Sequence, residues 1–328
     1  MAADRLPAGQ TRTEDRVTVL IPVYNGRNFL QQQLDSILAD PLVDRVLICD
    51  DASNDGTAEL LESICTTSRV RFYRNNSNLG VIRTVESLLH RVETEYFALA
   101  DQDDVWMENR IRHFIEMLDT SDAWLVYSDL TVVDERLSVI HRSRWQLSNQ
   151  KPLRGGAVES MIVKSPVNGC TIVASSKLLR VALPFPRKIP MHDTWLATVA
   201  AALGKLEYIR TATVLYRQHG NNESGGASSY TVRGLARRLR VHAGGSISRY
   251  SRQRLQHRLA LIDGLDRLGL VNGSLRFMHA YYSGNVLRRF LYLPRYLAIL
   301  LRKCRELGAR NIVSDIVMTL VPGQTHYP

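Results

Sequence analysis

The first 130 residues alternate short apolar, β-branched runs with segments of helical periodicity. This alternation is typical of consecutive βαβ units and predicts a mostly parallel sheet covered by helices. The clearest run is VTVLIPV (17–23), whose continuous apolar character predicts a buried strand that ends at a turn. Further strands are expected at 43–51, 69–75, 95–101 and 123–134, and helices at 29–40, 57–64, 79–92 and after residue 106.

Beyond residue 150 the alternation weakens, and a Gly/Ser-rich segment at 221–229 indicates a boundary. We expect a polar N-terminal tail (1–15), an α/β domain (16–225) and a basic α-helical C-terminal region (226–328). The four cysteines are far apart, and the polar start of the chain has no secretory pattern. These two features predict free thiols and a cytoplasmic protein.

Charge separates the same two regions. Residues 229–328 contain 17 Lys and Arg against 4 Asp and Glu, a net charge of +13, whereas residues 1–228 contain 25 against 28, a net charge of −3. A basic region of this kind indicates an anionic partner, either nucleic acid or a membrane surface. No pattern of a nucleic-acid-binding module is present, and an acidic sheet edge would repel a polyanion, so we expect no nucleic-acid partner.

The longest apolar stretch of this region, FLYLPRYLAILL (290–301), is too short to span a membrane and is interrupted by Pro294 and Arg295. A basic amphipathic helix that lies on an anionic membrane, at the cytoplasmic face of the inner membrane, fits this pattern better. A helical extension packed on the catalytic domain, or a homodimer interface, is the alternative.

The segment ALADQDDVW (98–106) places three carboxylates at the end of an expected strand. In an extended strand Asp101 and Asp103 would point to one side and Asp104 to the other. Two close carboxylates favour a hard divalent cation, Mg²⁺ or Mn²⁺, with positions left for the phosphate oxygens of a diphosphate. The alternative is a solvated turn in which Asp103 or Asp104 caps the next helix.

Four segments occur in a characteristic order: VLIPVYNG, ICDDASNDGTAELLE, NNSNLGVIRTVE and YFALADQDDVWMENRI. Over roughly residues 16–225 this series resembles the family 2 inverting glycosyltransferases, which implies an α/β doubly wound mixed sheet of the GT-A (nucleotide-diphospho-sugar transferase) fold. The later segments NGCTIVASSKLL, MHDTWLA and LYRQHGNNESG resemble the bacterial rhamnosyltransferase-like branch, which builds O-antigen, capsular and wall polysaccharides.

The resemblance implies a nucleotide-sugar site at the strand ends, on Pro22, Tyr24, Asn25, Asp50, Asp51, Asn78, Gly80, Arg83, Asp101 and Gln102. Within this set, Asp51 is expected to accept a hydrogen bond from a pyrimidine N–H. Asp50 could equally be a structural acceptor, and Arg83 a surface residue. Tyr24 could be a half-buried aromatic in a turn.

The same resemblance implies the metal and catalytic residues. Asp103, with Asp101 and His219, is expected to hold Mn²⁺ or Mg²⁺, and Asp104 to be mainly a turn or helix-start residue. Asp193 is expected to be the general base that takes the proton of the acceptor hydroxyl, or alternatively an N-cap of the helix that follows. The acceptor is expected to contact Asn168, Gly169, His192 and Trp195, with His192 as a second candidate base and Trp195 either a sugar-stacking aromatic or a core residue.

The expected function is therefore metal-dependent, inverting transfer of one sugar, L-rhamnose from dTDP-rhamnose, to a cell-surface glycan or its lipid-linked precursor. A UDP-hexose donor is the alternative within this fold, and a protein that only binds nucleic acid or membrane is the alternative from another class. A nucleotidyltransferase would need a Gly-rich loop with Arg or Lys after the first strand, and PVYNGRNF provides none. A processive synthase would need a Q-x-x-R-W motif, which is absent.

Overall fold

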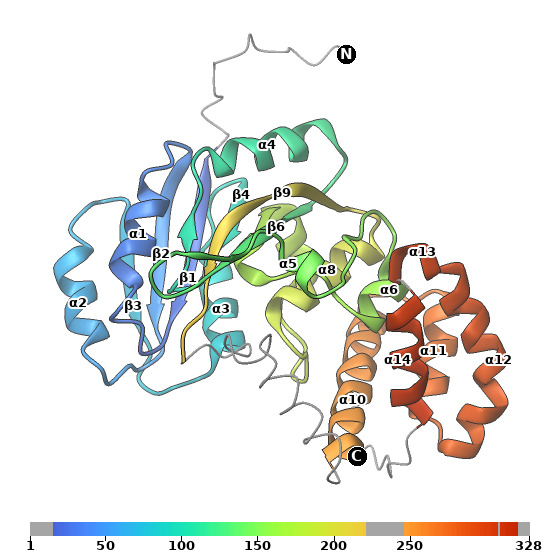
Figure 1. The fold of residues 1–328 in the computed structure, drawn as a ribbon. Coiled ribbons are helices and arrows are strands. Elements are labelled where there is room, and N and C mark those ends of the chain that lie inside the picture. Colours follow the sequence, from blue (N-terminus) through green and yellow to red (C-terminus); the bar gives the residue numbers. More distant parts are fainter. Residues whose placement is uncertain (1–15, 221–245, 308, 321–328) are drawn as a thin grey trace.

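The computed structural model describes residues 16–220, 246–307 and 309–320. In this part of the chain a nine-stranded sheet has the order β3-β2-β1-β4-β8-β6-β9-β5, and β7 pairs with β6 (Figure 1). The strands are β1 (Val17–Val23), β2 (Val43–Asp50), β3 (Val70–Arg74), β4 (Tyr96–Leu99), β5 (Val105–Trp106), β6 (Leu125–Val133), β7 (Val139–His141), β8 (Ile172–Ser175) and β9 (Leu206–Arg217). The expected tail (1–15) and the boundary segment (221–229) lie outside the described residues.

The helices alternate with these strands and then continue alone toward the C-terminus. They are α1 (Leu30–Leu38), α2 (Thr57–Ile64), α3 (Val81–Leu89), α4 (Arg110–Thr120), α5 (Arg144–Leu147), α6 (Val158–Val163), α7 (Leu179–Ala182), α8 (His192–Ala202), α10 (Ser246–Arg267), α11 (Gly273–Ser283), α12 (Val286–Arg302), α13 (Cys304–Leu307) and α14 (Ala309–Leu320). No described helix is both long and apolar enough to cross a membrane.

The sheet has a parallel half and a mixed half. Strands β3, β2, β1 and β4 are all parallel, as their intervening helices predict. Strand β8 is antiparallel to both β4 and β6, whereas β9 is parallel to β6. The expected mixed α/β sheet followed by C-terminal helices is thus confirmed, and the carboxyl ends of β1, β2 and β4 meet at one edge.

Side chains of β1 show how the sheet separates two cores. Val17, Val19 and Ile21 contribute to a core beneath α1, α2 and α4, whereas Leu20 belongs to a second core with α3, α6 and α8. This division follows from the two-residue repeat of a strand, and both faces are apolar because helices cover both. Figure 1 shows α1 and α2 on one flank of the sheet and the C-terminal helices beyond α8 on the other.

A buried charge network joins the C-terminal helices to helix α6. Arg258 of α10 donates to the Val163 carbonyl at the end of α6 (3.0 Å) and forms an ion pair with Asp315 of α14. The Tyr296 hydroxyl of α12 donates to the second oxygen of Asp315. Because a buried charge without its partner is strongly unfavourable, this network holds three helices and α6 in one arrangement.

Candidate active site

The turn after β1 lies against the acidic segment that follows β4. The Tyr24 backbone N–H donates to Gln102 Oε1 (2.9 Å), and Gln102 Nε2 donates back to the Tyr24 carbonyl (3.1 Å). A Cβ at Gly26 would lie 2.5 Å from Gln102 Oε1, so only glycine permits this approach. Pro22 is half-buried at the end of β1, and the Tyr24 ring is exposed. The structure thus brings Tyr24 and Gln102 of the predicted nucleotide site together.

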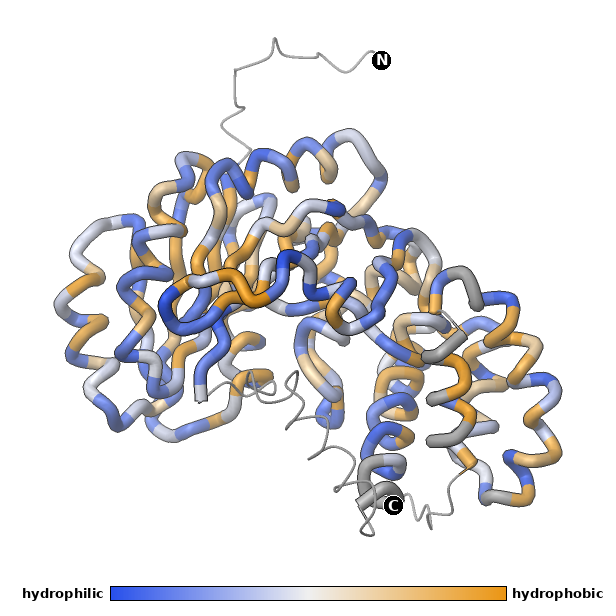
Figure 2. The backbone as a smooth tube through the Cα atoms, in the orientation of Figure 1, coloured by the Kyte–Doolittle hydropathy of each residue, from blue (hydrophilic) through white to orange (hydrophobic). Residues whose placement is uncertain are grey.

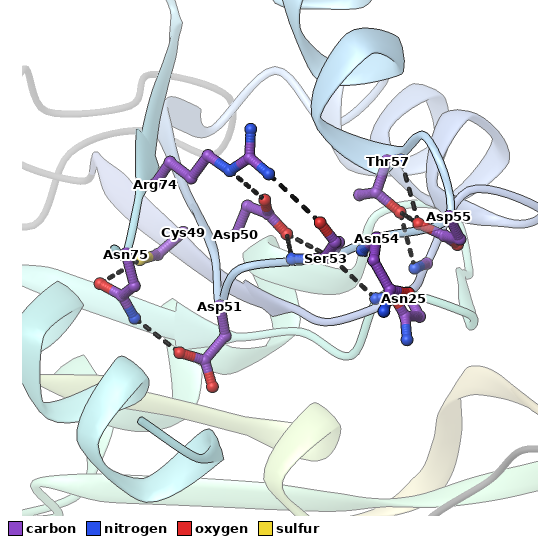
Figure 3. A network of polar contacts seen from close by, with 11 residues as sticks. Asn25, Cys49, Asp50, Asp51, Ser53, Asn54, Asp55, Thr57, Arg74 and Asn75 are labelled. Atoms are coloured by element: carbon purple, nitrogen blue, oxygen red, sulfur yellow. Dashed lines mark hydrogen bonds and ion pairs between the residues drawn. The ribbon is translucent and has the colours of Figure 1, made fainter. Parts of the chain in front are cut away.

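Asn25 and Asp50 organise the neighbouring turn (Figure 3). Asn25 has a left-handed backbone (φ 52°), and its Oδ1 accepts the Asn54 N–H (3.0 Å). Asp50 is fully buried, accepts from the backbone N–H of Ser53 (3.2 Å) and pairs with Arg74 Nε (3.2 Å). These contacts give Asp50 a structural role within the turn, which was the alternative interpretation of this residue.

The Asp51 carboxylate accepts hydrogen bonds from the loop before α3. Its Oδ1 accepts from Asn75 Nδ2 (2.7 Å) and from the Leu79 N–H (2.8 Å), and its Oδ2 accepts from the Gly80 N–H (2.8 Å). Figure 3 shows the Asn75 contact. Because a carboxylate has about four lone-pair sites, one acceptor position remains for a donor group on a ligand. The Gly80 φ of +81° favours glycine at this bend.

The other two predicted residues of this loop differ in exposure and pairing. Asn78 is exposed, and its Oδ1 accepts from the Gly80 N–H (3.1 Å). Arg83, in the first turn of α3, forms an ion pair with Glu86 and is partly exposed. Since Glu86 also accepts from the Phe185 N–H (2.5 Å), this arginine is held near the loop by a buried carboxylate.

A close side-chain pair is among the contacts between the acidic turn and the end of β9. Asp103 Oδ2 lies 2.7 Å from His219 Nε2, and both side chains are nearly buried. The Phe29 ring packs on the imidazole with a centroid distance of 4.8 Å. These two predicted metal residues are 116 positions apart in sequence, and the fold places them in contact.

The position of Asp104 differs from the expectation that its side chain points away from Asp101 and Asp103. Its side chain is fully buried (0% exposed), its Oδ1 accepts the Arg217 N–H (3.1 Å), and its carboxylate lies within 4.8 Å of ligand atoms of Asp101 and Cys170. Burial, and then the charges of Asp101 and Asp103, raise the pKa of Asp104 well above its ordinary value. Asp104 therefore does not face away, and it starts no helix, since α4 begins at Arg110.

The reason for this difference is the end of β4. The strand ends at Leu99, and residues 101–104 form a turn, so the two-residue alternation of side chains no longer applies. A thiol also lies in this cluster. Burial, followed by the charges of Asp104 and Asp101, raises the pKa of Cys170 well above 9.0, so the sulfur stays protonated and is a poor ligand for a hard cation.

The segment that contains Cys170 also packs on the start of helix α8. Helix α8 begins at His192, with Met191 as its N-cap, and Asp193 is in the first turn, where its Oδ1 accepts from the Thr194 N–H. Asp193 is therefore not the N-cap.

His192 and Gly169 adjoin this carboxylate. A Cβ at Gly169 would lie 3.2 Å from His192 Nε2 and 3.6 Å from the Asp193 Cβ, so the Asn168–Cys170 segment packs directly on the start of α8. Burial lowers the pKa of His192, and its Nδ1 has no hydrogen-bond partner among the described residues. A neutral imidazole at this position suits a hydrogen bond to a hydroxyl.

Trp195 is the predicted acceptor residue that the structure excludes. Its side chain is 1% exposed, and its Nε1 donates to the Ala182 carbonyl (2.9 Å). A Cβ at Gly264 of α10 would lie 2.6 Å from this indole. Trp195 thus belongs to the core between α8 and α10, where no sugar ring can stack on it.

Comparison with known proteins shows what the first half of the chain resembles. Residues 18–173 match the family described as glycosyl transferase family 2. The match covers slightly less than half of the chain, and over this region the chain is similar to family 2 glycosyltransferases. An uncharacterized glycosyltransferase of Haemophilus influenzae is 26% identical over 216 residues, which cover 63% of this chain and 67% of that protein. The dTDP-rhamnosyl transferase RfbG of Shigella flexneri is 26% identical over 227 residues, 64% of this chain and 75% of that protein.

Other relatives are much longer than the matched region. An uncharacterized glycosyltransferase of Rickettsia felis is 22% identical over 194 residues, which cover 57% of this chain but only 32% of that protein. Solved structures show the GT-A fold. Mannosyltransferase PcManGT from Pyrobaculum calidifontis, in complex with GDP-Man and Mn²⁺, has a TM-score of 0.54 at 17% identity and covers 93% of this chain and 86% of that one. S. aureus TarS 1–349 in complex with UDP-GlcNAc has a TM-score of 0.53 at 14% identity, covering 93% and 89%.

Arg217 is a residue of this candidate site that the sequence patterns missed. It is almost fully buried, and its guanidinium lies over the Phe29 ring at 4.6 Å. Its side chain donates to the Asp103 carbonyl (2.8 Å), the Glu135 carbonyl (2.5 Å) and Gln32 Oε1 (2.6 Å). One arginine therefore joins the acidic turn, α1 and the loop between β6 and β7. The sequence did contain a signal for a functional role of Arg217. This charged residue ends a largely apolar strand pattern, directly before QHG.

Because Arg217 donates to Asp103, the expected metal ligand, replacing Arg217 with Lys is predicted to weaken Mn²⁺-dependent donor binding by about 10- to 100-fold. Lysine retains the charge but cannot donate in three directions from a planar group. Titration of Mn²⁺ at fixed donor would measure the change. Arg210→Lys, on the exposed part of β9, is the matched control, and an equal loss in both variants would contradict a specific role of Arg217.

Proposed function

We propose that the chain transfers a single sugar, with inversion, from a nucleotide-diphosphate donor to an acceptor hydroxyl. One observation carries this proposal: the Asn168–Cys170 segment separates the predicted base from the predicted metal site. Gly169 packs on Asp193, and Cys170 lies beside Asp101 and Asp104. An attacking hydroxyl and a departing diphosphate need groups of these two kinds on opposite sides of one sugar carbon.

In this mechanism Asp193 accepts the proton of the acceptor hydroxyl as the oxygen attacks the anomeric carbon. Neutral His192 and the backbone at Asn168 and Gly169 position the acceptor hydroxyl beside Asp193. Because the proton is removed as the new bond forms, the acceptor oxygen does not carry a full charge at any step.

The donor side is proposed to use carboxylate oxygens and an imidazole. Asp103, Asp101 and His219 are hard or intermediate ligands of the type that Mn²⁺ and Mg²⁺ accept. A cation held there supplies charge neutralisation for the departing diphosphate. The nucleotide is proposed to lie on Tyr24, Asn25 and Asp51, with Asn78, Gly80 and Arg83 at the loop beside it and Pro22 and Gln102 supporting the turn.

The finer assignments rest on resemblance to relatives. We propose dTDP-rhamnose as the donor, which the similarity to the Shigella flexneri dTDP-rhamnosyl transferase supports, and UDP-hexose as the alternative. The acceptor is proposed to be a cell-surface glycan of the O-antigen, capsule or wall type, or its lipid-linked precursor at the cytoplasmic face of the inner membrane. The division into a catalytic domain (16–225) and a basic extension (226–328), with homodimer formation as an alternative use of the extension, belongs to the same proposal.

Thermal unfolding in the presence of dTDP- and UDP-sugars, with and without Mn²⁺, tests the donor. The cognate donor with Mn²⁺ is expected to raise Tm by about 5–10 °C, because a ligand at about 100 times its Kd contributes about 2.7 kcal/mol. dTDP-rhamnose should give the largest shift. Equal shifts for all nucleotides would assign recognition to the diphosphate alone, and no shift with any donor would overturn the proposed function.

A further inference from the structure

Helix α12 presents an apolar face to solvent. Its inner face is buried through Arg289, Tyr296 and Leu300. On its outer face Leu287 is 76% exposed and Leu291 is 78% exposed. Two more large apolar side chains on this face are exposed, Phe290 at 54% and Leu301 at 62%. Isolated exposed leucines are common on protein surfaces, but four on one helix require an explanation.

The exposed residues form one continuous stripe along the helix. Leu287, Leu291, Pro294, Ala298 and Leu301 are all exposed and are separated by alternating steps of four and three residues. At 100° per residue these positions fall within about 80° of the helix circumference, with Phe290 beside them. The stripe extends over the whole length of the helix and leaves the inner face to the core.

Arginines follow one border of this stripe. Arg288, Arg295 and Arg302 are exposed and seven residues apart, so they lie in a row beside the leucines. No Asp or Glu occurs from residue 273 to residue 302. Arg295 and Arg302, with Ala298, also line a pocket of about 580 Å³ between α12 and the start of α11. The row therefore places positive charge next to an apolar surface, and neither α11 nor α12 contributes an acidic residue to it.

The position of α12 leaves this surface accessible. In Figure 1 the helix lies at the outer edge of the C-terminal helices, on the side away from the sheet. Figure 2 shows orange apolar and blue polar residues interleaved along this outer helix, as expected for an amphipathic face. The described part of the chain contains no segment that covers it.

We propose that the outer face of α12 docks on an anionic lipid bilayer. The four exposed apolar side chains enter the boundary between headgroups and acyl chains, and the arginine row contacts lipid phosphates. This inference deepens the proposed function and rests on it in one respect, because a lipid-linked acceptor would lie at the same surface. The helix lies on the membrane in this arrangement and does not cross it.

Charge favours a membrane over a second copy of the chain. Pairing two α12 faces would bring together two arginine rows, and neither face offers an acidic partner. An anionic bilayer supplies the missing negative charge over the whole row. The same reasoning predicts that binding depends on anionic lipid and weakens as salt screens the arginines.

Flotation of the full chain with vesicles tests this proposal. Vesicles of phosphatidylcholine and phosphatidylglycerol should carry the protein to the top of the gradient, and phosphatidylcholine alone should not. Leu287→Glu/Leu291→Glu should reduce the bound fraction at least about tenfold, because it places two charges in the apolar stripe. Val139→Glu/Ile140→Glu is the matched control, since these two exposed residues of β7 lie outside the stripe.

Three outcomes would overturn the inference: no flotation of the unaltered chain with anionic vesicles, equal flotation of the α12 variant, or loss of flotation in the control as well. A dimer in solution that the α12 variant converts to monomer would instead assign the face to a second copy. Donor-induced stabilisation should be unchanged in the α12 variant, which verifies its fold. Because donor binding and flotation are measured separately, failure of one does not imply failure of the other.

Discussion

Asp193→Asn is expected to lower the rate of sugar transfer by about 10²- to 10⁴-fold, the usual contribution of a general base. Asparagine is nearly isosteric with aspartate, so the contact with Gly169 and the hydrogen bond from the Thr194 N–H are retained. Only the ability to accept a proton is removed. Donor binding should be unchanged, because Asp193 adjoins Gly169, whereas Asp101 of the proposed metal site adjoins Cys170.

The measurement is kcat with the cognate donor, together with the donor-induced shift in Tm. Asp122→Asn is the matched control, since its carboxylate is 89% exposed, pairs with Lys205 and is remote from the sheet edge. A full rate in Asp193→Asn would assign the base to another residue, and His192 is then the candidate to replace with Gln. A loss of donor binding in Asp193→Asn would contradict the proposed separation of roles.

Asp103→Asn is expected to abolish the Mn²⁺-dependent part of donor stabilisation. Asp103 is 9% exposed and contacts His219, so its charge is partly desolvated and acts strongly on a nearby cation. An amide oxygen carries no net charge and binds Mn²⁺ less well. The expected result is loss of most of the 5–10 °C shift that donor and Mn²⁺ together produce, an effect of about 2–3 kcal/mol.

Loss of the His219 contact could also lower the stability of the protein without ligand, so Tm is measured first without donor or metal. The comparison variant is Asp44→Asn, which removes a carboxylate paired with Arg16 at the amino end of β2. His219→Gln should give an intermediate loss if His219 is a third ligand. A full Mn²⁺-dependent shift in Asp103→Asn would place the cation on other residues.

The strands and helices of the first half were predictable because their signals are local. A continuous apolar run predicted β1 with its observed bounds, 17–23, and helical spacing predicted α1 within a residue or two at each end. Strand direction was less predictable. Strand β8 lies between β4 and β6 and is antiparallel to both. A short apolar run predicts a strand but does not indicate its direction in the sheet.

Short segments of the sequence predicted only some of the site residues. Acidic residues at strand ends indicated the sheet edge, since parallel strands deliver their carboxyl ends to one side. The roles of Asp104 and Trp195 were wrong or undecided because they depend on burial, which a short segment does not reveal. Arg217 was missed for the same reason: its partners come from α1, the acidic turn and the β6–β7 loop.

What the sequence alone determined was the order of elements, the family resemblance and the residue types at the sheet edge, because periodicity and motif spacing are properties of neighbouring residues. Tertiary structure decided which of them meet. It placed His219 on Asp103, buried Asp104 beside Cys170, and set Gly169 against Asp193. The physical reason is that contact, desolvation and pKa arise between segments far apart in the chain, and only the packed sheet and its helices bring those segments together.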